Sequence, residues 1–157
     1  MLNQHWPRWV FASISKHFSD NRQGLPLFIE GQQRDTRSLK DFIELRLDGP
    51  QFTEISRNYW RIYFEVNILV QSTMDDKNYH RIHQNVGIVA AAFTGIVLYK
   101  YGNGSSDDQK AWACANLIQD TAKRQHLDIF HFGQIDKQLQ LMQATVEGHY
   151  ETFVIGG

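Results

Sequence analysis

The stretch from Tyr59 to Ser72 reads YWRIYFEVNILVQS, and it decides the fold of this chain. Successive side chains of a β-strand point to opposite faces of its sheet, so an apolar residue at every second position predicts a strand with one buried face. We therefore predict a central antiparallel strand over Tyr59–Ser72 with its even-numbered side chains in the core. Six of these are apolar: Trp60, Ile62, Phe64, Val66, Ile68 and Val70.

Working outward, similar patterns predict further strands. Phe42–Asp48 alternates, with Ile43, Leu45 and Leu47 on one face, and Gly49-Pro50 is expected to end this strand or to start a bend. The short apolar run Leu25–Glu30 is a further strand candidate, and its Pro26 predicts a position at a sheet edge or near the start of the strand. The remaining predicted strands are Ile96–Tyr101, Ile129–Ile135 and Leu139–Phe153.

Helical periodicity appears in two segments. In the first, Trp6, Val10, Ile14 and Phe18 recur at fourfold spacing, and Pro7 suits a first helical turn. The second spans Tyr79–Phe93, with Asn78 as its expected N-cap. For residues 109–125 the pattern leaves a helix and a strand equally open.

The order of these elements indicates one α+β domain over residues 1–157. No internal repeat and no linker-like stretch divides the chain. Long antiparallel strands accompanied by helices predict a two-layer sandwich, with a mostly antiparallel sheet and the helices packed on one of its faces.

Composition argues against several classes of function. The chain has 16 Lys+Arg and 17 Asp+Glu, and this balance disfavours wrapping by a polyanion, so we expect no sequence-specific nucleic-acid binding. The longest apolar run, residues 87–99, is shorter than the ~20 residues of a membrane-spanning helix, so no membrane partner is expected. The N-terminus lacks the pattern of a signal peptide.

Histidines provide the candidate metal ligands. His80 and His83 are three residues apart in a predicted helix, and His126, Asp128 and His131 form a second group. In a strand, His131 would point away from the face shared by His126 and Asp128. We therefore expect solvated or interface histidines and no metal or cofactor, with a two-histidine metal site as the alternative.

Nothing in the sequence indicates a catalytic site. The single cysteine, Cys114, lies in Ala-Cys-Ala, which predicts a small buried side chain and not a nucleophile. The run Gly102-Asn103-Gly104 lacks the lysine and hydroxyl residue of a phosphate-binding loop. We expect no catalytic residues.

Two polar, glycine-bearing segments are longer than typical hairpin loops and are the predicted contact regions. These are Gly31–Lys40 and Gly102–Asp108, and ordering such loops costs backbone entropy that new contacts must offset. We predict charged contacts with a neighbouring subunit or partner through Arg34, Arg37, Asp107 and Asp108, and the alternative is two solvated loops that contact no partner.

The element order resembles that of the small tail-terminator (tail-completion or neck) proteins of long-tailed bacteriophages. The resemblance is carried by the helix Trp6–Phe18, by FIELRLDGP at 42–50 and by NYWRIYFEVNILV at 58–70. It continues through the helix beginning near Asn78, the strand Ile96–Gly102 and the closing stretch Val146–Tyr150. Residues 31–40 and 109–125 have no counterpart in it.

The resemblance implies a structural virion protein without cofactor or reaction. Such a protein is assembled in the host cytoplasm and forms a homohexameric ring, through which DNA passes. Its partners would be the tail tube protein and the head-side connector protein. The alternatives are another head–tail connector or neck protein, and a small metal- or ligand-binding α+β enzyme that uses the histidines.

Overall fold

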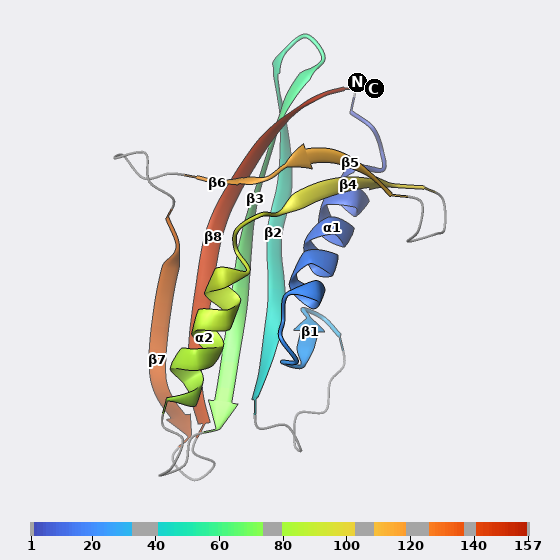
Figure 1. Ribbon diagram of the computed structural model, residues 1–157. Coiled ribbons are helices and arrows are strands. Elements are labelled where there is room, and N and C mark those ends of the chain that lie inside the picture. Colours follow the sequence, from blue (N-terminus) through green and yellow to red (C-terminus); the bar gives the residue numbers. More distant parts are fainter. Residues whose placement is uncertain are drawn as a thin grey trace.

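The computed structural model describes residues 2–32, 41–73, 80–102, 109–118, 126–136 and 141–156 (Figure 1). Its elements are, in chain order, α1 (Trp6–Asp20), β1 (Leu27–Ile29), β2 (Asp41–Ser56), β3 (Tyr59–Thr73), α2 (Arg81–Ala91), β4 (Val97–Tyr101), β5 (Gln109–Cys114), β6 (Asn116–Leu117), β7 (Asp128–Asp136) and β8 (Leu141–Ile155).

A six-stranded sheet forms the body of the molecule. β3 pairs antiparallel with β2 on one side and with β8 on the other, as predicted for a central strand. The short strand β1 extends the sheet beyond β2 in parallel, while β6 and β7 both pair antiparallel with β8 at the opposite edge. A separate two-stranded sheet joins β4 and β5.

The even-numbered side chains of β3 are buried, which confirms the prediction from the alternating pattern. Trp60 is half-buried, and the residues that follow it at every second position are fully buried: Ile62, Phe64, Val66, Ile68 and Val70. β8 is in register with β3, so Ala144, Val146 and Tyr150 face the same core. The odd-numbered residues of β3 and β8 lie on the other side, which we call the outer face.

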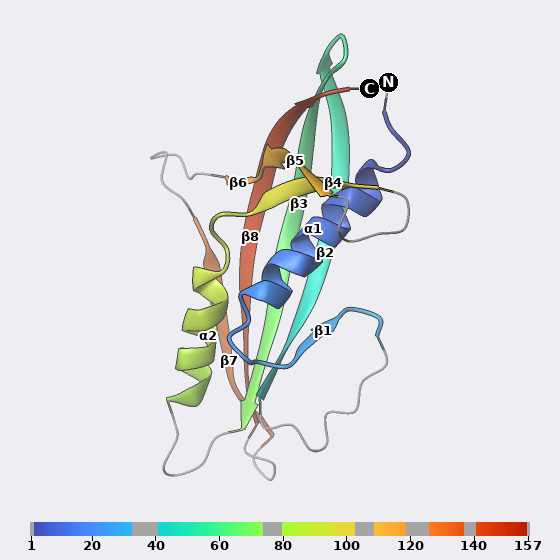
Figure 2. The same ribbon diagram turned by 45° about the vertical axis from the view of Figure 1, so that its right-hand side comes forward.

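Both helices contribute their apolar stripes to one core with the sheet. Val10 and Ile14 of α1, and Ile82 and Val86 of α2, belong to the same buried cluster as Phe64. Figures 1 and 2 show α1 and α2 on the same side of the large sheet, with β4 and β5 crossing that side. The expected α+β class is therefore confirmed.

A buried hydroxyl links β8 to the end of α2. The Tyr150 hydroxyl donates to the Phe93 carbonyl oxygen at 2.6 Å, and burial raises the pKa of Tyr150 above its usual range. The Tyr150 ring stacks on Phe64 at 5.2 Å between centroids. This one side chain therefore satisfies a backbone acceptor and fills the core between the two layers.

Several sequence expectations need correction. β2 does not end at Gly49-Pro50 but continues to Ser56. The pairing of β2 with β3 shifts in register between Asp48 and Gln51, and such an irregularity bends a strand without ending it. α2 begins at Arg81 with His80 at its N-cap position, and the expected cap Asn78 lies outside the described residues. Cys114 is exposed, and the stretch 109–125 contains the strands β5 and β6 in its described part.

Candidate assembly interface

The β2–β3 hairpin projects beyond the helices at one end of the molecule (Figures 1 and 2). Its turn places Asn58 at φ 61°, a left-handed conformation that asparagine tolerates better than most residues. The Asn58 N–H donates to a Glu54 carboxylate oxygen at 2.9 Å. The end of β8 is tied to the turn, because Gly156 N–H donates to the Asn58 carbonyl at 2.8 Å and Asn58 Nδ2 donates to the Gly156 carbonyl at 3.0 Å. These bonds fix the projecting end.

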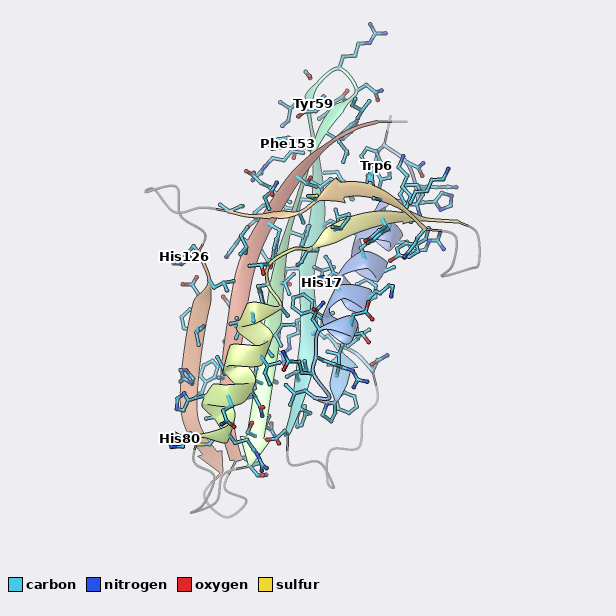
Figure 3. All side chains as sticks on the ribbon, in the orientation of Figure 1. Trp6, His17, Tyr59, His80, His126 and Phe153 are labelled. Atoms are coloured by element: carbon cyan, nitrogen blue, oxygen red, sulfur yellow. The ribbon has the colours of Figure 1, made fainter. Side chains whose placement is uncertain are left out.

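Four large apolar side chains are exposed on this end, and we call them the tip patch. Tyr59 and Phe153 stack, with their ring centroids 5.9 Å apart and their planes 13° apart, and Figure 3 shows both near the projecting turn. Ile155 lies opposite Tyr59 in the β3–β8 register. The exposed fractions are 52% for Ile55, 40% for Tyr59, 42% for Phe153 and 75% for Ile155.

The tip patch has the character of a protein-contact surface. A cluster of apolar side chains in water usually marks an interaction site, and aromatic residues are enriched in such sites. The hydrogen bonds at the turn hold this surface in place, so little side-chain and loop entropy remains to be lost on contact. The arrangement therefore favours docking of another protein surface.

Polar groups continue from the patch along the outer face. Arg61 and Glu151 form an ion pair at 2.8 Å, and the Arg61 guanidinium lies 5.1 Å from the centre of the Tyr63 ring. The Tyr63 hydroxyl lies 2.7 Å from Glu65 Oε1 and 2.7 Å from His149 Nδ1. Partial burial, together with the bond to Glu65, raises the pKa of Tyr63 to about 12.

The group formed by Tyr63, Glu65 and His149 lies on the outer face of the sheet. The Glu65 and His149 side chains are 38% and 40% exposed. A hollow of about 250 Å³ lies in another part of the surface, between α1 and β4, and is lined by Ser13, His17 and Tyr99 among others. Half-exposed polar groups beside an apolar centre are typical of the rim of a protein interface, so this arrangement favours a polar border to the tip patch.

The structure brings together histidines that the sequence placed in separate groups. His83 of α2 and His131 of β7 have ring centroids 4.9 Å apart, and His126 Nε2 lies 2.8 Å from an Asp128 carboxylate oxygen. In the described ranges, no group of three or more His, Cys, Asp or Glu side chains is arranged to hold a metal ion. The His83–His131 contact arises because β7 pairs with β8 beside α2.

The structure does not test the interface residues predicted from the loops. Arg34, Arg37, Asp107 and Asp108 lie outside the residues that the structure describes. The tip patch itself was missed, although a signal was present. Tyr59, Phe153 and Ile155 are apolar residues at odd positions of strands whose even positions form the core.

No helix in the described part of the chain is long and apolar enough to cross a membrane. No protein-family model matches the sequence, and no curated protein is detectably similar to it. A protein of known structure that carries only a numerical designation resembles this one, with a TM-score of 0.56 at 15% sequence identity. The likeness covers 92% of this chain and 94% of that one. It shows a shared fold and no function.

Proposed function

We propose that this chain is a structural virion protein that closes the tail tube of a long-tailed bacteriophage as a ring and joins it to the head-side connector. The tip patch is the observation that carries an assembly role. The tail role rests on the resemblance in element order described above. On this proposal, the partners are further copies of the chain, the tail tube protein and the connector protein.

The energetics of the patch support an assembly role. Apolar surface gains roughly 25 cal/mol for each Å² removed from water, and aromatic residues in the centre of an interface often dominate its affinity. Tyr59 and Phe153 are already stacked, and Arg61 lies next to them, paired with Glu151. Aromatic side chains bordered by a paired arginine have the composition of a binding hot spot.

The tail role is tested with tail tubes polymerised from the tube protein of the phage that encodes this chain. We expect the purified chain to decorate one end of each tube in electron micrographs and to stop further elongation. An Ile155→Lys variant should leave tube ends bare, because a lysine in the tip patch must lose its hydration for assembly to proceed.

Phe11→Lys is the matched control, because Phe11 is a large apolar residue of α1 that is 41% exposed and lies outside the tip patch. This variant should cap tubes as the unchanged chain does. Tubes that keep growing with bare ends in the presence of the unchanged chain would contradict the tail role. Binding to the isolated connector, without binding to tubes, would assign the chain to another neck position.

A further inference from the structure

Two histidine rings meet between α2 and β7. The rings of His83 and His131 have centroids 4.9 Å apart and planes inclined by 50°. Both residues are exposed, and among the described residues neither ring has a hydrogen-bond or ion-pair partner. By contrast, polar contacts engage the rings of His5, His17, His126 and His149. The nitrogen lone pairs of His83 and His131 are therefore free for a shared ligand.

The fold brings these two side chains to one place. His131 lies opposite Ala144 in the β7–β8 register, and Ala144 faces the core, so the His131 side chain lies on the side of the sheet that carries the helices. α2, which contains His83, lies beside β7 on that side (Figure 1). The register of β7 with β8 shifts directly after His131, and such irregularities re-aim side chains. A helix and a strand that belong to different layers therefore each contribute one imidazole.

The distance between the rings fits two ligands of one metal ion. A bond of about 2.1 Å from Zn²⁺ to an imidazole nitrogen puts the ring centre about 3.2 Å from the ion. Two such rings at an angle of about 90–110° around the ion, as in octahedral or tetrahedral coordination, have centres roughly 4.5–5.2 Å apart. The observed 4.9 Å lies within this range. Because both rings are exposed, water can bind the ring nitrogen that does not contact the ion.

We propose that His83 and His131 together bind one divalent transition-metal ion, with water completing its coordination. Imidazole nitrogen suits Zn²⁺, Ni²⁺ and Cu²⁺, whereas Mg²⁺ and Ca²⁺ prefer oxygen ligands. No third His, Cys, Asp or Glu of the described residues joins the pair, so the other coordination positions are open to water. The ion clamps α2 to β7, which pairs with β8 alone among the described strands. This site does not depend on the proposed function.

Titration calorimetry with Zn²⁺ tests the site on the full chain, purified without a histidine tag. We expect one Zn²⁺ per chain at the strongest site, and an equal concentration of Mg²⁺ should not displace it. His83→Ala and His131→Ala should each weaken the binding roughly 100-fold, because each removes one arm of a two-armed ligand. The double variant should bind no more weakly than either single variant, since either change alone already destroys the chelate.

His126→Ala is the matched control, because the His126 side chain is 52% exposed and pairs with Asp128 instead of a second histidine. This variant should bind Zn²⁺ as the unchanged chain does. In the unchanged chain, a small amount of Cu²⁺ should broaden the imidazole NMR signals of His83 and His131 before those of the other histidines. Additive losses in the two single variants would mean two separate one-histidine contacts and would overturn the inference, as would equal weakening by His126→Ala or the absence of Zn²⁺ binding.

The clamp between α2 and β7 is tested by thermal unfolding. An ion that binds the folded chain more tightly than the unfolded chain raises the melting temperature. Excess Zn²⁺ should therefore raise the melting temperature of the unchanged chain and of His126→Ala, but not that of His83→Ala. Circular dichroism spectra without metal establish that the variants are folded. Binding of Zn²⁺ that leaves the melting temperature of the unchanged chain the same would contradict the clamp.

Discussion

Phe64→Ala is expected to lower the free energy of unfolding by about 3–5 kcal/mol. Phe64 is fully buried in β3, stacks on Tyr150 at 5.2 Å and faces the core shared by the sheet and both helices. Removing its ring loses the transfer free energy of the buried surface and leaves a cavity that neighbouring strands cannot fill. Urea unfolding followed by tryptophan fluorescence measures the change.

The matched control is Phe153→Ala in the neighbouring strand β8. Phe153 is 42% exposed and its packing partner is Tyr59, so this change should cost about 1 kcal/mol. If Phe64→Ala had the same unfolding midpoint as the unchanged chain, β3 would not be the central buried strand.

Trp6→Ala should destabilise the protein by a similar amount, about 3–5 kcal/mol. Trp6 is 1% exposed at the start of α1, and its ring contacts aromatic rings of three strands. The centroid distances are 5.7 Å to Phe52 of β2, 6.0 Å to Trp60 of β3 and 5.2 Å to Trp112 of β5. Its removal therefore loosens α1 from both sheets at once.

Phe11→Ala on the same helix is the control for Trp6. Its side chain is 41% exposed, and substitutions at such surface positions usually change stability by about 0.5 kcal/mol or less. The melting temperatures of Trp6→Ala, Phe11→Ala and the unchanged chain are compared by thermal unfolding under the same conditions. Equal melting temperatures for Trp6→Ala and the unchanged chain would mean that α1 is not anchored through this ring.

The parts of the fold that depend on local pattern could be predicted from the sequence. The period of two in Tyr59–Ser72 identifies β3 and its buried face, since strand geometry alone determines which side chains share a face. The fourfold spacing of Trp6, Val10 and Ile14 identifies α1, because side chains four residues apart lie on one face of a helix. These segments bury one continuous face each, so tertiary structure reinforces the local signal.

Residues 109–118 show where local pattern fails. Their described part forms two short strands, β5 and β6, which pair with two different partners, β4 and β8. A strand of this length is stabilised by its neighbours more than by its own propensity. Cys114 is the last residue of β5 and its side chain is exposed, so the burial predicted from its two alanine neighbours is wrong.

The candidate sites could not be predicted from the sequence, because they depend on which residues of two strands lie opposite each other. Tyr59 and Phe153 are 94 positions apart and stack only because β3 and β8 pair with Tyr59 opposite Ile155. His83 and His131 likewise meet through the pairing of β7 with β8 beside α2. By contrast, the exposure of odd-numbered apolar residues on these strands could have been anticipated from the alternation itself.

The mass of the purified chain in solution tests the central claim, self-assembly into a ring, most directly. Light scattering coupled to size-exclusion chromatography should give one species whose mass is a fixed multiple of the chain mass, and negative-stain images of that peak should show closed rings. The resemblance to tail terminators predicts six copies in each ring. A chain that remains monomeric up to its solubility limit would contradict the account.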